Sequence, residues 1–183
     1  MNHDEMDAMS MIEYRARVER AASIKDGEAI YNGTTEHAQI VIEALFRSAT
    51  SCVRILSHAL NHGVYNHPRT LDAAEEFLAR NPNASLEILV ERNPHECREG
   101  SEFLSRFGKD KRVKQLLVPT DVQNLYRFHF AVADRESYRF EDDKTRHAAI
   151  ASFGSPKGAS NLDKIFQSLW RVGKPFVREQ ITA

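Results

Sequence analysis

The last third of the sequence carries side chains with the chemistry to bind or attack a phosphate group. His129 opens an apolar run, and Arg139 and Glu141 follow a short distance beyond it. An imidazole can act as a nucleophile or as a general acid and base, and the planar guanidinium of arginine binds phosphate well. The period-two alternation of a strand places Arg139 and Glu141 on one face. We expect these three side chains and Ser152 to line a polar pocket.

A purely structural interpretation of the same side chains stays open. Arg139 and Glu141 would then form an ion pair on an edge strand, and His129 would be a core histidine with its hydrogen bonds satisfied. The first interpretation places the imidazole beside a hollow large enough for a phosphate, whereas the second encloses it.

The order of features from His129 to Trp170 resembles the phospholipase D superfamily. A strand with His129 is followed by a turn at Asp134, an answering strand, a strand ending in Ala-Ser-Phe-Gly at 151–154, and a helix ending in Phe-Gln-Ser-Leu-Trp. Family members carry His-x-Lys on a strand, an aspartate a few residues later, and Gly-Ser-x-Asn at the end of a second strand. The resemblance extends over residues 36–172 in element order, and its motifs lie between His129 and Trp170.

This resemblance implies a phosphodiesterase chemistry. In the family, one histidine attacks phosphorus, and a histidine from a second copy of the motif acts as general acid and base. Lysine and asparagine hold the phosphate oxygens. His129 would be the nucleophile here, and a chain with one motif would need a homodimer to bring two histidines together. The resemblance also implies a bacterial domain that works beside a separate effector.

The sequence departs from the family pattern at three places. Ala131 stands where the family has its lysine, and Asp134 lies closer to the histidine than the family spacing. Ser152 keeps the serine of the second signature, but the asparagine is lost. Loss of one such oxyanion donor typically costs about 10²–10³ in rate. The sequence therefore predicts a degenerate, non-catalytic member of the superfamily.

A second polar segment, residues 58–67, follows the end of an apolar run, where open α/β sheets place ligands. It contains His58, His62 and His67. Their spacing suits a metal ion only on a regular helix, which Gly63 and Pro68 in the same stretch disfavour, so we predict no metal site. His58 and Asn61 lie closest to the strand end and are candidate ligand-binding residues. Nothing in the sequence predicts a cofactor, because the glycine-rich segment 154–161 lacks the P-loop pattern.

Hydrophobic periodicity predicts an α/β order of elements around these side chains. Helices are expected at 36–49, 70–80, 99–107 and along a stripe from Leu162 to Trp170. Strands are expected at 52–56, 86–90, 113–118, 128–133, 138–141 and 147–153, with residues 29–31 as a short strand or an extended arm. We predict a phospholipase D-like mixed sheet of about six or seven strands with helices on both faces. Residues 1–25 are assigned to an N-terminal helical extension, with a helix over 3–23, and residues 26–183 to the α/β domain.

Composition bears on the class of protein, its partners and its cellular compartment. Of the 183 residues, 42% are hydrophobic and 28% are charged, which is ordinary for a globular domain, and a net charge of −1 gives no bulk signal for nucleic acid or membrane binding. No apolar run approaches the ~18 residues of a membrane span. Two cysteines, Cys52 and Cys97, without a secretory signal favour a reducing cytoplasm. We expect a cytoplasmic protein with no membrane partner.

Three functions are compatible with this reasoning. The favoured one is a binding or regulatory module for a phosphate-containing ligand such as a nucleotide, for nucleic acid, or for a partner protein. The alternative is a homodimeric phosphodiesterase or nuclease, with His129 as nucleophile and Arg139 in place of the lost lysine. The third is a structural subunit that assembles through residues 3–23 and the C-terminal tail.

Overall fold

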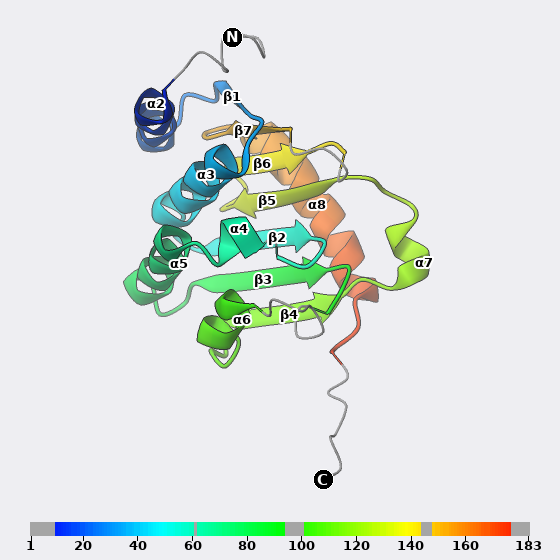
Figure 1. Cartoon of the computed structure of the whole chain (residues 1–183). Coiled ribbons are helices and arrows are strands. Elements are labelled where there is room, and N and C mark those ends of the chain that lie inside the picture. The colour runs from blue at the N-terminus through cyan, green and yellow to red at the C-terminus, as the bar shows by residue number, and fades with distance from the viewer. Residues whose placement is uncertain (1–9, 61, 94–100, 144–147, 177–183) are drawn as a thin grey trace.

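The structure is a computed structural model, and it describes residues 10–60, 62–93, 101–143 and 148–176. Asn61, Cys97 and residues 3–9 of the expected N-terminal helix lie outside the described residues. The described part forms a seven-stranded mixed sheet with helices on both faces (Figure 1). This confirms the predicted α/β architecture.

The order of strands across the sheet is β1-β7-β6-β5-β2-β3-β4. β2, β3 and β4 are parallel, and β5, β6, β7 and β1 are added in antiparallel steps. The strands are β1 (Ala29–Asn32), β2 (Cys52–Ser57), β3 (Ser85–Val90), β4 (Val113–Leu117), β5 (His129–Ala133), β6 (Ser137–Glu141) and β7 (Ala149–Ser152). The segment 29–31 is therefore an edge strand and not a free arm.

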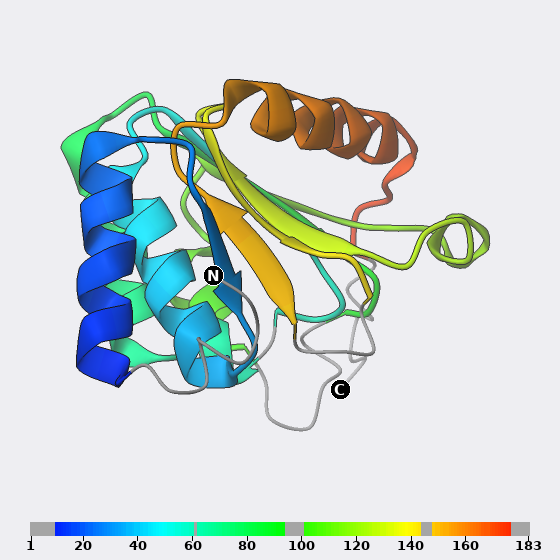
Figure 2. The same ribbon diagram turned by 90° about the horizontal axis from the view of Figure 1, so that it is seen from above.

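Helices cover the two faces of the sheet unequally. Among the helices that the structure describes, α8 alone lies on one face, and α2, α3, α4, α5 and α6 lie on the other (Figures 1 and 2). The helices are α2 (Met11–Ile24), α3 (Thr35–Ser48), α4 (His62–Tyr65), α5 (Pro68–Arg80), α6 (Glu102–Phe107), α7 (Thr120–Gln123) and α8 (Pro156–Val172). Because both faces are covered, the central strands can be apolar on both sides.

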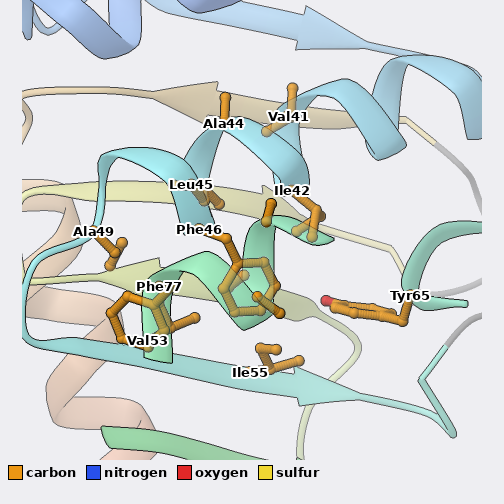
Figure 3. Close-up of a cluster of buried hydrophobic side chains, with 14 of the residues drawn as sticks. Val41, Ile42, Ala44, Leu45, Phe46, Ala49, Val53, Ile55, Tyr65 and Phe77 are labelled. Atoms are coloured by element: carbon orange, nitrogen blue, oxygen red, sulfur yellow. The ribbon is translucent and has the colours of Figure 1, made fainter. Parts of the chain in front are cut away.

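The larger hydrophobic cluster fills the space between the sheet and the α3–α5 layer. Phe46 from α3 and Phe77 from α5 are both buried, with ring centroids 6.1 Å apart, and they pack over Val53 and Ile55 of β2 (Figure 3). A second cluster under α8 contains Phe166. These two clusters, one on each face, anchor the sheet. The polar side chains at the ends of the strands are positioned on this fixed frame.

The N-terminal helix α2 packs against α3, and three of its side chains are buried: Tyr14, Val18 and Ala21. Ser10 caps the helix through a reciprocal hydrogen-bond pair with Glu13. Lys25 ends it with a left-handed backbone, and its amide donates to the Ala21 carbonyl. The chain then enters β1 directly, so this helix is tied to the sheet through a strand.

Two short helices were not expected from the sequence. α4 contains Gly63 and lies within the segment that we expected to be an irregular polar loop, and that expectation is wrong for His62–Tyr65. Val64 and Tyr65 are buried against the core, so tertiary packing overrides the local preference against helix. α7 is a single turn in the long connection from β4 to β5.

Asp134 has a structural role in the turn between β5 and β6. Asp134 and Arg135 both have left-handed backbones, with φ of 54° and 58°, and the Glu136 amide donates to the Ala133 carbonyl at 3.0 Å. This is the geometry of a tight hairpin turn. The Asp134 carboxylate accepts hydrogen bonds from the backbone amides of residues 50, 51 and 52. The side chain thus clamps the start of β2 to the hairpin.

Candidate functional site

A cluster of polar side chains lies at one edge of the sheet. β2 and β3 end there, β6 also ends there, and the antiparallel strand β5 begins there. The register pairs His129, the first residue of β5, with Glu141, the last residue of β6. The position of the cluster follows from strand direction, since parallel strands bring their carboxyl ends to the same edge.

Glu91 joins two histidines in this cluster. Its Oε1 lies 3.4 Å from Nε2 of His129, and its Oε2 lies 3.0 Å from Nδ1 of His58. The Glu91 side chain is 2% exposed and that of His129 is 10% exposed, whereas His58 reaches the solvent. The imidazole of His129 is therefore largely enclosed, with a carboxylate at one ring nitrogen.

Glu141 lies on the other side of His129. Its Oε2 is 4.0 Å from Nδ1 of His129 and 3.7 Å from Nη1 of Arg139. Arg139 also donates from Nε to Oδ1 of Asn32 at 2.9 Å, and Asn32 donates to the Ala149 carbonyl at 3.1 Å. The guanidinium is thus held between a carboxylate and a buried amide.

Arg139 lies beside the position where the family lysine is missing. The β5–β6 register pairs Ala131 with Arg139, and Ala131 follows His129 by two residues, so the three positions share a face of the sheet. Arginine on the neighbouring strand therefore brings a cation to the region that Ala131 leaves uncharged.

A cavity of about 50 Å³ lies between this cluster and the helices α3 and α4. The volume has room for a few water molecules or one small oxyanion. Its wall is formed by two threonines at the start of α3, by α4 and by the strand ends: Thr34, Thr35, Ala38, Ile42, Leu56, Ser57, Val64, Tyr65, His129, Phe130, Arg139 and Glu141. Tyr65 lies at one end of the hydrophobic cluster drawn in Figure 3.

Two tyrosines near the cluster keep their hydroxyl protons at neutral pH. Burial raises the pKa of the Tyr65 hydroxyl above its ordinary value. Burial also raises the pKa of Tyr126, and the neighbouring Glu91 carboxylate raises it further. Both phenols can therefore donate hydrogen bonds but cannot act as bases.

The structure brings together four of the six candidate residues. His129, Arg139 and Glu141 line the cavity, and His58 joins them through Glu91. Ser152 lies elsewhere, because the register places it opposite Tyr138, several residues from the edge that His129 occupies. Its hydroxyl donates to the Gly27 carbonyl at 2.9 Å and it is 2% exposed. Asn61, the sixth, lies outside the described residues.

Sequence reasoning missed Glu91 and Asn32. Glu91 directly follows β3. Open α/β sheets place ligands beyond the carboxyl ends of their strands, and this expectation, which selected His58, also applies to Glu91. Asn32 ends β1, and no local pattern links it to Arg139 more than a hundred residues later. Within the described residues, no three His, Cys, Asp or Glu side chains are grouped so that they could hold a metal ion.

The fold and this edge of the sheet can now be compared with known proteins. Residues 34–178 match the family model for a domain of unknown function, DUF7931. The chain belongs to this family. No curated protein matches the sequence of this DUF7931 chain.

Solved structures show that the DUF7931 chain has a phospholipase D-like fold. It is similar to Nuc, a phospholipase D family member from Salmonella typhimurium, with a TM-score of 0.61 at 11% identity, covering 84% of this chain and 100% of that chain. NucT from Helicobacter pylori gives a TM-score of 0.59 at 10% identity and covers 82% of this chain and 100% of NucT. TrmBL2, an archaeal chromatin protein whose structure shows a novel mode of DNA binding, gives 0.60 at 11% identity, with 94% of this chain and 64% of TrmBL2 covered. At these identities the likeness concerns the fold.

No helix in the described ranges combines the length and apolar character required to cross a bilayer.

Proposed function

We propose that this chain is a binding module of phospholipase D-like fold that does not hydrolyse phosphodiesters. One observation carries the proposal: both ring nitrogens of His129 face carboxylates, Glu91 on one side and Glu141 on the other. A histidine that attacks phosphorus needs a ring nitrogen with a lone pair directed at the substrate. Here Nε2 is buried 3.4 Å from a Glu91 oxygen, and Nδ1 lies 4.0 Å from a Glu141 oxygen, so a carboxylate stands close to each nitrogen.

The charges around His129 also oppose a bound phosphate. At an effective dielectric constant of 20, two unit charges about 4 Å apart interact by about 4 kcal/mol. The attraction of Arg139 for a phosphate oxygen would offset the repulsion from one carboxylate but not from two. Because Arg139 already contacts Glu141 and Asn32, reorienting its guanidinium would cost those contacts as well.

Three features support a binding role for the scaffold that remains. The strand ends hold four polar side chains, His129, Glu141, Glu91 and His58, close together. A small cavity lies beside His129, and the cluster reaches solvent through His58. TrmBL2, which has a similar fold, is a DNA-binding chromatin protein. Among the ligand classes compatible with the sequence, nucleic acid is therefore the one we favour. The cavity is too small for a polymer, so such a ligand would bind to the outer surface.

Hydrolysis of bis(p-nitrophenyl) phosphate tests the proposal. We expect the purified protein to release no nitrophenol above the level of its His129→Ala variant. The matched control is Ser152→Ala, which changes a buried hydroxyl outside the cluster. Hydrolysis by the parent chain and the Ser152 variant, but not by the His129 variant, would contradict the proposal.

One observation favours a second candidate function, a homodimeric phosphodiesterase. Arg139 lies opposite Ala131 in the sheet, where it could supply the positive charge that the missing lysine would provide. This candidate predicts that Arg139→Ala removes hydrolysis and Arg139→Lys retains part of it. It also requires a dimer that presents two copies of His129 to one phosphorus, which sedimentation analysis can test.

A further inference from the structure

The outer face of α8 carries a row of basic side chains. Lys157, Lys164 and Arg171 are exposed and follow one another at seven-residue intervals, so they lie nearly in line along one side of the helix. Neighbouring cations in this row are separated by about 10 Å along the helix axis. Because the chain has a net charge of only −1, the row is a local concentration of charge and not a consequence of composition.

No exposed carboxylate interrupts this row on α8, which the structure describes throughout. The only acidic residue of the helix, Asp163, is buried. Its two oxygens are occupied by arginines, because Arg54 donates to Oδ1 at 2.6 Å and Arg135 lies 2.9 Å from Oδ2. The negative charge of Asp163 is therefore directed inward and neutralised.

Arg135 extends the basic surface beyond the helix. Its side chain is 62% exposed, and it projects from the β5–β6 turn towards α8. A shallow hollow of about 580 Å³ lies between the turn and the helix. Besides Arg135 and Asp163, its lining residues are polar or cationic: Ser160, Lys164, Gln167, Ser168 and Arg171. The hollow therefore offers hydrogen-bond donors beside fixed positive charges.

We propose that this basic face, defined by Lys157, Lys164, Arg171 and Arg135, binds the phosphate backbone of double-stranded nucleic acid. The row spans about 21 Å along the helix axis, and a duplex carries one negative charge per ~1.7 Å of its axis. Lysine, arginine, serine and glutamine are among the side chains that contact phosphate oxygens, and such contacts carry no sequence information. The proposal rests on the binding function proposed above and gives it a surface and a ligand class.

The structure disfavours two other anionic partners. Single-stranded nucleic acid is bound with the help of exposed aromatic side chains on which bases stack. On α8, Phe166 is buried, and Trp170 is half-buried and stacked on Phe166 with ring centroids 5.4 Å apart. A membrane surface is bound by helices that insert their apolar face. The apolar face of α8 is already packed on the sheet through Leu162, Phe166 and Leu169.

Fluorescence anisotropy with a labelled 20-base-pair DNA duplex tests the proposal across a series of NaCl concentrations. Three to four phosphate contacts predict that log K falls with log [NaCl] at a slope of about −3 to −4. The triple variant K157Q/K164Q/R171Q should reduce the slope to about −1. Between 50 and 200 mM NaCl, wild-type affinity should then fall roughly 100-fold, and that of the variant only a few-fold. Two duplexes of unrelated sequence should bind equally well.

Matched controls come from the opposite face of the sheet. Arg20 on α2 and Arg69 on α5 are exposed cations, and these two helices lie across the sheet from α8 (Figures 1 and 2). R20Q/R69Q should therefore leave the affinity and the salt slope unchanged. All variants alter exposed side chains, and circular dichroism verifies their folding.

The proposal is overturned if the wild-type protein does not bind the duplex at 50 mM NaCl, or if the triple variant binds it as tightly as the wild type. Preferential binding to single strands, or binding only to phosphatidylserine vesicles, would also overturn it. Duplex binding together with His129-dependent hydrolysis would contradict the non-catalytic function and leave the basic surface in place.

Discussion

Replacement of Asp134 should show that the family-like aspartate of this chain stabilises the fold. The carboxylate accepts hydrogen bonds from the amides of Thr50, Ser51 and Cys52 at 2.7–2.9 Å, and from the hydroxyls of Thr50 and Ser51 at 2.9 and 2.8 Å. These contacts join the hairpin to the start of β2. The two exposed hydroxyls can bond to water in a variant, so the three amides dominate the cost.

The expected losses differ between two substitutions. Each amide bond is worth about 1 kcal/mol, so Asp134→Ala should lose about 3 kcal/mol from the hydrogen bonds. Alanine in the left-handed conformation adds about 1 kcal/mol, which brings the total to about 4 kcal/mol. Asparagine tolerates this backbone and keeps one acceptor oxygen, so Asp134→Asn should lose about 1–2 kcal/mol.

The contribution of Asp134 should also depend on pH. Burial opposes ionisation of this carboxyl, but hydrogen bonds from Cys52, Thr50 and Ser51 outweigh burial and hold its pKa below the ordinary 3.8. A lowered pKa in the folded state means that the stabilisation is complete above the pKa of the unfolded chain. It is lost as the pH falls through the folded pKa. The difference in the free energy of unfolding between wild type and Asp134→Asn should therefore become smaller below about pH 4.

Urea unfolding followed by circular dichroism measures these differences, with unchanged m-values as evidence that the variants remain two-state. Measurements at pH 7 and at two values below pH 4 give the pH dependence. The reasoning is refuted if Asp134→Ala costs less than about 1 kcal/mol, or if the wild type and the asparagine variant differ equally at every pH.

Three further substitutions test the packing of the fold. Gly154→Ala should destabilise the fold by about 2–3 kcal/mol in urea unfolding, because the added Cβ would lie 2.0 Å from the Lys25 carbonyl at a φ of +82°; a neutral effect would contradict the close approach of the α2–β1 and β7–α8 connections. Arg54→Met should cost about 3 kcal/mol, since the half-buried guanidinium contacts both Glu87 and the buried Asp163, and an unchanged thermal midpoint would argue against that role. Phe77→Ala should cost about 3–5 kcal/mol because this ring is fully buried, and a loss under 1 kcal/mol would count against the α5 packing.

The sequence by itself determined the architecture of this protein. Alternating and continuous apolar runs marked the strands, and the stripes of α3, α5 and α8 marked the main helices, because both patterns repeat over distances that a local window contains. The rule that ligands bind beyond the ends of parallel strands selected His58, which lies beside Glu91 in the structure, and period-two alternation predicted that Arg139 and Glu141 share a face, as they do at the cavity. The sequence did not predict α4, whose residues become helical only through the burial of Val64 and Tyr65.

Tertiary structure decided what the polar residues do. Glu91 lies 38 positions before His129, and Asn32 lies 107 positions before Arg139, so no local pattern links either pair. Only the parallel order of β2 and β3, the antiparallel insertion of β5 and the register of β6 bring carboxylates to both sides of the imidazole. The pairing of β6 with β7 places Ser152 opposite Tyr138, away from the cluster. The β5–β6 turn places the Asp134 carboxylate against the amides at the start of β2. Hydrogen bonds and charges act over a few ångströms, and contacts at that range depend on how distant segments pack.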